Sequence, residues 1–192
     1  MNVEQIKKLV PEIGDIPLYL VNIAELAITA FSQGYGLESA QMCLNGAAAG
    51  WFHGVDGPVL GIQIDALLLQ RMTEAELRAV LLHEVGHIKL DHIPTIEETL
   101  SGVGLKGTFE GREIEADMFA LENGADIVDL CNGIKAVAKV QLAQTIVAFK
   151  GIKGVAMPEA TIRRVVRSSL VDHKMRIRNL LAILRRSINE GY

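Results

Sequence analysis

The fold is decided by the stretch Met72-Thr-Glu-Ala-Glu-Leu-Arg-Ala-Val-Leu-Leu-His83-Glu84-Val-Gly-His87-Ile-Lys-Leu-Asp-His92. Thr73 followed three residues later by Glu76 has the form of a capping box, which begins a helix. After it, apolar residues recur at close to the helical period, at Leu77, Val80, Leu81, Val85, Ile88 and Leu90. The stretch therefore predicts one long helix.

The same helix carries a metal-binding pattern, His83-Glu84-Val-Gly-His87. Four residues advance an α-helix by about 400°, so His83 and His87 lie one above the other, as two nitrogen ligands of a single Zn²⁺ must. Glu84 lies about 100° round the helix from His83, where it can reach a water molecule without binding the metal. The pattern predicts a zinc site with Glu84 as general base. The alternative is a surface helix with two solvated histidines.

A second helix offers the third ligand. Residues 111–124 show an apolar stripe at helical spacing and end on a glycine, which is a common helix stop. Glu113 and Asp117 share one face of this helix, whereas Glu115 points away from it. We expect Glu113 to bind the metal and Asp117 to orient a ligand imidazole through its other ring nitrogen. The alternative is an acidic, solvated helix N-terminus that complements the helix dipole.

Taken together, these motifs resemble the gluzincin metallopeptidases of the HtpX and CAAX-prenyl-protease type. The resemblance rests on residues 73–88, on Arg112-Glu113-Ile-Glu-Ala-Asp117 and on Gly124-Ala-Asp126. It implies that His83, His87 and Glu113 bind one zinc ion per chain and that Glu84 activates water. Members of this family are often embedded in the membrane, whereas this chain resembles a soluble, minimal version.

Two strands are expected before the zinc helix, as a hairpin with its turn at residues 53–57. Residues 59–65 have the composition of a strand, and residues 41–52 that of a weaker one because they are rich in alanine and glycine. In the family that the chain resembles, the strand just before the zinc helix forms the cleft edge and pairs with an extended substrate. The resemblance thus assigns substrate binding to Val59, Leu60, Gly61 and Ile62. The alternative is an inner strand with no free edge.

Two further histidines are candidates for the site. In the family that the chain resembles, a histidine of the C-terminal region faces the zinc and steadies the oxyanion, and the resemblance assigns this catalytic role to His173. The alternative for His173 is a structural or solvated histidine. His92 follows His87 by five residues and lies on a different helix face, so we expect it near the helix C-terminus rather than on the metal.

The rest of the chain predicts an α+β fold that is mainly helical. Further helices are expected over residues 2–10, 18–33, 127–150, 158–169 and 172–187. Residues 94–111 are expected to form a loop that gates the cleft. Residues 1–150 are expected to form a zincin-like metallopeptidase domain, with a small sheet packed on the zinc helix. Residues 151–192 would add a helical pair that completes the same domain.

The composition bears on the compartment of the protein, on whether it spans a membrane, and on its partners. Cys43 and Cys131 are in no metal-ligand spacing and are expected to be reduced, which suits the cytoplasm. No apolar run reaches the roughly 18 charge-free residues of a transmembrane helix. Residues 1–149 hold 9 Lys and Arg against 20 Asp and Glu, and residues 150–192 hold 10 against 3. A basic end can bind nucleic acid, but such arginines more often form a solvated face or pair with the acidic body of the same protein. Nucleic acid is therefore not an expected partner.

The sequence predicts a zinc metalloendopeptidase that acts on a peptide or protein substrate. One alternative is a regulatory protease of the ImmA type that acts on one partner protein; those families carry Glu-Ala-Asn where this chain has Glu115-Ala-Asp117. The other is a non-enzymatic module stabilised by zinc. A structural zinc normally has four protein ligands, so an open fourth position favours the enzyme.

Overall fold

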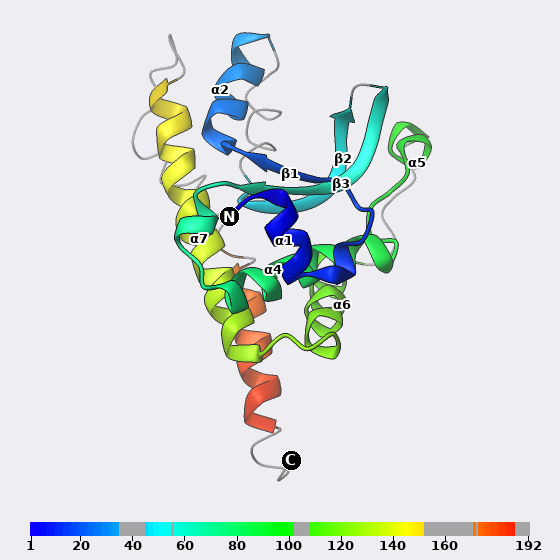
Figure 1. The fold of residues 1–192 in the computed structure, drawn as a ribbon, viewed down its shortest axis with the longest axis vertical. Helices are drawn as coiled ribbons and strands as arrows, with labels where there is room; N and C mark the ends of the chain where they lie inside the picture. Colours follow the sequence, from blue (N-terminus) through cyan, green and yellow to red (C-terminus); the bar gives the residue numbers. More distant parts are fainter. Residues whose placement is uncertain (35–44, 55, 102–107, 152–170, 172, 187–192) are drawn as a thin grey trace.

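A small mixed sheet lies among helices that make up most of the chain (Figure 1). The structure, a computed structural model, describes residues 1–34, 45–54, 56–101, 108–151, 171 and 173–186. Its strands are β1 (Leu18–Val21), β2 (Ala47–Gly54) and β3 (Gly57–Asp65), in the spatial order β1-β3-β2. The predicted α+β, mainly helical fold is confirmed.

The strand before the zinc helix is an inner strand. β3 pairs antiparallel with β2, with Ala47 opposite Ile64, and parallel with β1, with Leu18 opposite Ile62. β3 is thus paired on both sides at residues 62–65 and is not a free edge there, whereas Val59, Leu60 and Gly61 pair with β2 alone. The substrate role of Val59, Leu60, Gly61 and Ile62 stays a prediction. A Cβ on Gly61 would lie 2.7 Å from the carbonyl oxygen of Pro17. The glycine thus serves the close approach of the chain that leads into β1.

β1 corrects a prediction, since residues 18–21 were expected to begin a helix. The sequence Leu-Tyr-Leu-Val is rich in strand formers, and it pairs with the far side of β3. The helix begins only at α2 (Ile23–Ser32), because the Asn22 side chain accepts a hydrogen bond from the Glu25 N–H at 3.3 Å. The local apolar pattern did not separate the strand from the helix that follows it.

The other predicted helices are present where the chain is described. They are α1 (Val3–Leu9), α4 (Glu74–Lys89), α6 (Phe109–Glu122), α7 (Ile127–Gly151) and a C-terminal helix over residues 173–186. Two 3₁₀ turns connect helices with strands: η1 (Pro11–Ile13) lies between α1 and β1, and η2 (Leu68–Gln70) lies between β3 and α4. The loop expected over residues 94–111 contains a short helix, α5 (Ile96–Ser101), so it is not a simple loop. The predicted helix over 158–169 and the cap at Asp172 lie outside the described residues.

The helix that carries the predicted zinc pattern, α4, lies in the core of the protein. Every residue of α4 from Ala79 to Gly86 is buried, and the helix contacts α6, α7 and β2. A Cβ on Gly86 would lie 3.2 Å from Cα of Ala116 on α6, so these two helices approach each other closely at this glycine. Leu180 of the C-terminal helix, 1% exposed, belongs to the same apolar core. The domain boundary at residue 150 stays a prediction.

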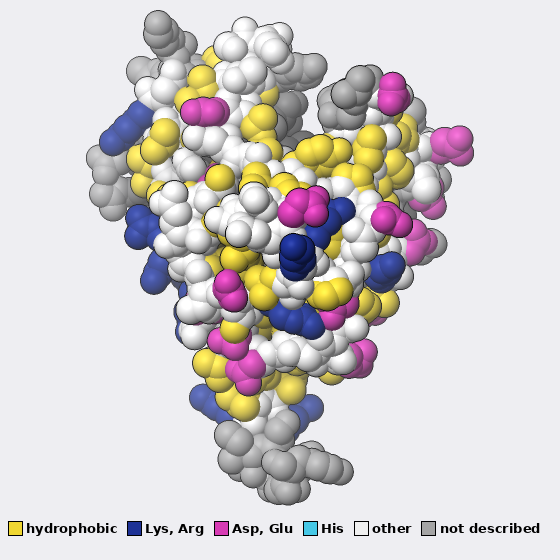
Figure 2. Space-filling model, in the orientation of Figure 1, with side chains coloured by type: hydrophobic (Ala, Val, Ile, Leu, Met, Phe, Trp, Pro, Cys, Tyr) yellow, Lys and Arg dark blue, Asp and Glu magenta, His cyan; other side chains and the backbone are white. Residues whose placement is uncertain are grey.

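The surface is of mixed character. On the face shown in Figure 2, acidic and basic side chains are scattered among apolar ones without a large patch of one sign. Among the described helices, none combines the length and the apolar character that crossing a membrane requires.

Candidate metal centre

The two histidine-bearing turns of α4 are positioned by how this helix begins and where it is buried. The Thr73 side chain accepts the Glu76 N–H at 3.2 Å and the Glu76 carboxylate accepts the Thr73 N–H at 2.9 Å, which is the predicted capping box. Three turns later His83 and Glu84 are buried and His87 is half-buried. The helix therefore presents its polar residues to the interior of the protein, where they need partners.

Three side chains from two helices converge on one point. Nε2 of His83 lies 3.0 Å from Nε2 of His87, and these atoms lie 3.4 and 3.3 Å from the two carboxylate oxygens of Glu113 on α6. A tetrahedral Zn²⁺ with bonds of about 2.0–2.1 Å sets its ligand atoms about 3.3 Å apart. Two imidazole nitrogens and one carboxylate oxygen thus fit zinc in both chemistry and spacing. In the described part of the chain, these three residues form the group that could hold a metal.

Asp117 lies behind His83, on the side away from this point. Its Oδ1 is 2.8 Å from Nδ1 of His83, which leaves Nε2 free to face a metal. Burial raises the pKa of Asp117, but the hydrogen bond with His83 and the charge of Arg176 outweigh it and hold that pKa below its usual value. Burial likewise raises the pKa of Glu113, and its contacts with His83 and His87 bring the pKa far below normal. Both carboxylates are therefore ionised at neutral pH.

Arg176 is a residue of the site that the sequence reasoning did not assign. It reaches in from the C-terminal helix, donates to Asp117 at 2.6 and 3.2 Å, and places Nη1 3.2 Å from Glu113. Its side chain is only 9% exposed. The available signal was the basic charge of residues 150–192 opposite an acidic body, which indicated pairing without saying which arginine pairs.

His92 lies behind the second ligand histidine. Its Nδ1 is 3.1 Å from Nδ1 of His87, and its Nε2 is 2.9 Å from the Glu115 carboxylate. His92 is therefore near the site but not on the metal point, as expected. Burial lowers the pKa of His92 more than Glu115 raises it, so the ring is neutral at pH 7. Glu115 points away from Glu113 and Asp117, as predicted, yet it reaches the site through His92.

Glu84 faces a cleft beside the edge strand. A cavity of about 550 Å³ is lined by the three candidate ligands, by Glu84, and by Ala47, Ala48 and Ala49 of β2. The Ala49 N–H donates to Oε2 of Glu84 at 2.8 Å. None of the four β3 residues that the sequence assigned to substrate binding lines this cavity. The strand beside the candidate centre is β2.

His173 lines the same cavity and lies close to the centre. Its Nε2 is 3.0 Å from Oε1 of Gln141, whose Nε2 in turn lies 3.5 Å from Asn45. Burial, followed by the charge of Arg176, lowers the pKa of His173 to about 4, so the ring is neutral at pH 7. Its one N–H then points at Gln141, and its buried Nδ1 has no partner among the described residues. The oxyanion role of His173 stays a prediction, and it requires the other tautomer.

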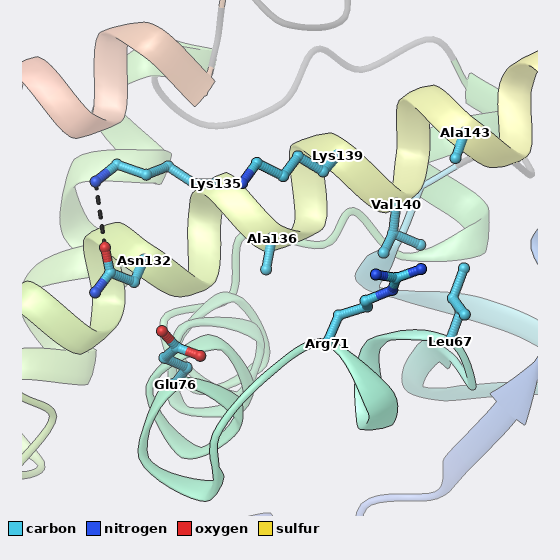
Figure 3. A pocket seen from close by; sticks show the side chains of 9 residues that line it. All are labelled: Leu67, Arg71, Glu76, Asn132, Lys135, Ala136, Lys139, Val140 and Ala143. Carbon is cyan, nitrogen blue, oxygen red and sulfur yellow. Dashed lines mark hydrogen bonds between the residues drawn. The ribbon is translucent and has the colours of Figure 1, made fainter.

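A second cavity, of about 540 Å³, lies between α7 and the segment that leads into α4 (Figure 3). Lys135 and Lys139 of α7 and Arg71 border it, together with the carboxylate of Glu76 (Figure 3). That carboxylate already accepts a hydrogen bond from the Thr73 N–H in the capping box. The described residues that line this cavity include no set of metal ligands, so the candidate metal site is in the first cavity.

Comparison with known proteins gives one result that bears on this site. Residues 23–110 match the model of peptidase family M48, which is a little under half of the chain. The matched part includes β2, β3 and the whole of α4, and it ends before Glu113. The match supports a metallopeptidase of the HtpX and CAAX-prenyl-protease type, and with it a peptide or protein substrate. No curated protein and no solved structure matches the chain.

Proposed function

We propose, from the match to peptidase family M48 and the convergence of two imidazoles and a carboxylate, that the protein is a zinc-dependent metalloendopeptidase. The observation that carries the proposal is the ligand spacing of 3.0–3.4 Å beside a cleft that holds Glu84. His83, His87 and Glu113 would hold the ion. Three protein ligands leave a coordination position open, which is the arrangement of catalytic rather than structural zinc.

Glu84 is assigned the role of general base. When bound, Zn²⁺ would activate a water molecule and polarise the scissile carbonyl. Among the described residues, two carboxylates line the cleft, those of Glu84 and Glu113, and Glu113 is assigned to the metal. Glu84 therefore takes the proton from water and passes it to the leaving amine. The Ala49 N–H holds one of its oxygens at 2.8 Å and so sets the direction of the carboxylate.

The substrate is proposed to lie along β2. Its pairing partner is β3 on one side, and alternate N–H and C=O groups of an edge strand point the other way. The Ala49 N–H belongs to that outward set, because it bonds to Glu84 rather than to β3. An extended peptide paired with Ala47–Ala49 would bring its main chain to the metal point. This is an alternative to the role that the sequence assigned to β3.

A substitution at Glu84 tests the proposal. Glu84→Gln keeps an oxygen that can accept the Ala49 N–H but cannot take a proton. We expect about one zinc per chain in both proteins by elemental analysis, and a loss of casein and peptide-library cleavage of at least about 100-fold in the variant. Glu122→Gln, at an exposed carboxylate in the last turn of α6, is the matched control and should keep full activity. Equal cleavage by wild type and Glu84→Gln would remove Glu84 from this role.

The same assays distinguish a general peptidase from the two alternatives predicted from the sequence, a regulatory protease of one partner and a non-enzymatic zinc module. A protein that binds zinc but cleaves no casein and no random peptide is the regulatory protease of one partner or the non-enzymatic module. Glu113→Ala should lose the metal, and unchanged zinc content would exclude Glu113 as the ligand. The cytoplasmic location also stays a prediction; Cys131 is a buried, free thiol, as a reducing compartment requires.

A further inference from the structure

A chain of hydrogen-bonding groups leads from the second ligand histidine to the protein surface. Nδ1 of His87 lies 3.1 Å from Nδ1 of His92, and Nε2 of His92 lies 2.9 Å from the carboxylate of Glu115. The His92 side chain is 6% exposed, whereas that of Glu115 is 66% exposed. The chain therefore begins at the metal point, crosses one buried ring and ends in solvent.

The backbone after α4 is shaped to bring His92 to this place. Asp91 has φ of 58°, in the left-handed region that residues other than glycine rarely adopt, and this turns the chain back on the helix. The His92 N–H then donates to the carbonyl oxygen of His87 at 2.9 Å. Arg112 of α6 donates to the carbonyl oxygen of His92 at 3.4 Å. The His92 main chain is thus held by two hydrogen bonds, one to the main chain of His87 and one from the Arg112 side chain.

A metal at the proposed site leaves one arrangement of protons along this chain. Nε2 of His87 faces the metal point at 3.3 Å from Glu113, so a bound ion takes its lone pair and the proton stays on Nδ1. That N–H can only donate, and Nδ1 of His92 must accept. The proton of the neutral His92 ring is then on Nε2, where it donates to Glu115.

We propose that His92 and Glu115 are positioning residues that set the orientation and basicity of His87, so that a carboxylate at the surface helps to determine the zinc affinity of a buried site. The inference rests on the proposed zinc site. It also explains why the two ligand histidines differ. His83 is oriented by the buried pair of Asp117 and Arg176, whereas His87 is oriented through a ring that a surface residue controls.

Zinc affinity measured by competition with a chromophoric chelator tests the proposal. We expect Glu115→Ala and His92→Leu each to raise the zinc Kd by about tenfold, the low end for residues that support a metal ligand. His92→Gln should recover most of the affinity, because its amide can accept from His87 and donate to Glu115. Glu122→Ala, at an exposed carboxylate on the same helix, is the matched control and should leave the Kd unchanged.

The Glu115→Ala variant should fold normally, because the Glu115 side chain is mostly exposed and its truncation leaves no cavity in the core. If Glu115→Ala and His92→Leu both bind zinc as wild type does, the proposal is overturned. The proposal also fails if His92→Gln is as weak as His92→Leu, because burial and not hydrogen bonding would then be the role of the ring.

A second measurement shows which ring nitrogens of His87 and His92 carry the protons. Long-range ¹H–¹⁵N spectra of the zinc-loaded protein should show His92 protonated at Nε2 and bare at Nδ1, and His87 protonated at Nδ1. A His92 ring with its proton on Nδ1 would contradict the chain. Wild type that binds no zinc would overturn this inference together with the zinc site. Wild type that binds zinc but cleaves no casein and no random peptide would exclude a general peptidase, and the comparison of zinc affinities would still decide this inference.

Discussion

At the scale of single residues, Arg176 is the cation that keeps two buried carboxylates together when no metal is bound. It lies 3.2 Å from Glu113 and 2.6 Å from Asp117, and its side chain is 9% exposed. We expect Arg176→Leu to lower the unfolding free energy of the metal-free protein by about 3–5 kcal/mol, because both carboxylates lose their buried positive partner. Zinc should recover part of this loss, since the ion supplies positive charge at the same place.

Urea unfolding of the wild type and the variant, each with chelator and with zinc, measures this effect. Arg178→Leu is the control, because Arg178 is an exposed arginine on the same helix. Equal losses in the two variants would show that Arg176 acts only as part of a solvated face.

His173 gives a pH dependence with a defined sign. Burial, followed by the charge of Arg176, lowers its pKa from 6.5 to about 4 in the folded protein. The unfolded chain therefore binds a proton more readily, and stability is lost as the pH falls from 6.5 to about 4. The full shift corresponds to roughly 3 kcal/mol. Thermal unfolding of the metal-free protein across this range should show a smaller loss for His173→Gln, and parallel curves would assign the acid sensitivity elsewhere.

At the scale of elements, the contact between α4 and α6 sets the distance from the histidine pair to Glu113. A Cβ on Gly86 would lie 3.2 Å from Ala116 and from Phe119, so alanine there must push the two helices apart by a few tenths of an ångström. We expect Gly86→Ala to weaken zinc binding by about tenfold through displacement of Glu113.

Gly133→Ala is the matched control for this change. Its Cβ would lie 2.6 Å from Val80, at the contact between α7 and α4, and away from α6. Both variants should unfold more easily than wild type, and only Gly86→Ala should lose zinc affinity. A loss of zinc affinity in both would mean that general strain, and not the spacing of α4 and α6, weakens the site.

The edge of β2 makes a prediction about the substrate. If an extended peptide pairs with Ala47–Ala49, its own main-chain N–H groups on that side donate to β2. N-methylation of a cleaved peptide at those positions should raise KM by about tenfold per lost hydrogen bond in the dry part of the cleft. Methylation at the alternate positions should change KM little. A KM that is indifferent to every methyl group would exclude strand pairing.

At the scale of the whole molecule, the C-terminal helix supplies parts that the rest of the chain lacks. Leu180 is 1% exposed in the main core, and Arg176 closes the charge network of the site. We expect a chain ending at Lys150 to melt roughly 10–20 °C below the full chain, from the lost ion pair and the lost apolar burial. Circular dichroism melting measures this, and a truncated chain that melts like the full one would make residues 151–192 a separate unit.

The sequence alone could determine those features of the fold and of the site that depend on residues close to one another in the chain. The capping box at Thr73, the stacking of His83 over His87, and the shared face of Glu113 and Asp117 follow from helical spacing, and the structure has all three. The hairpin of β2 and β3 belongs here too, because its turn is short.

Only the tertiary structure decided which strand lies at the edge of the sheet and which side chains form hydrogen bonds with each ligand histidine. Strand order depends on the pairing of Leu18 with Ile62, which no local pattern encodes. The partners of the ligand histidines, Asp117 with Arg176 and His92 with Glu115, come together from separate segments of the chain. Burial of polar groups forces such pairings, but their identity depends on how the helices pack, and that is a property of the whole fold.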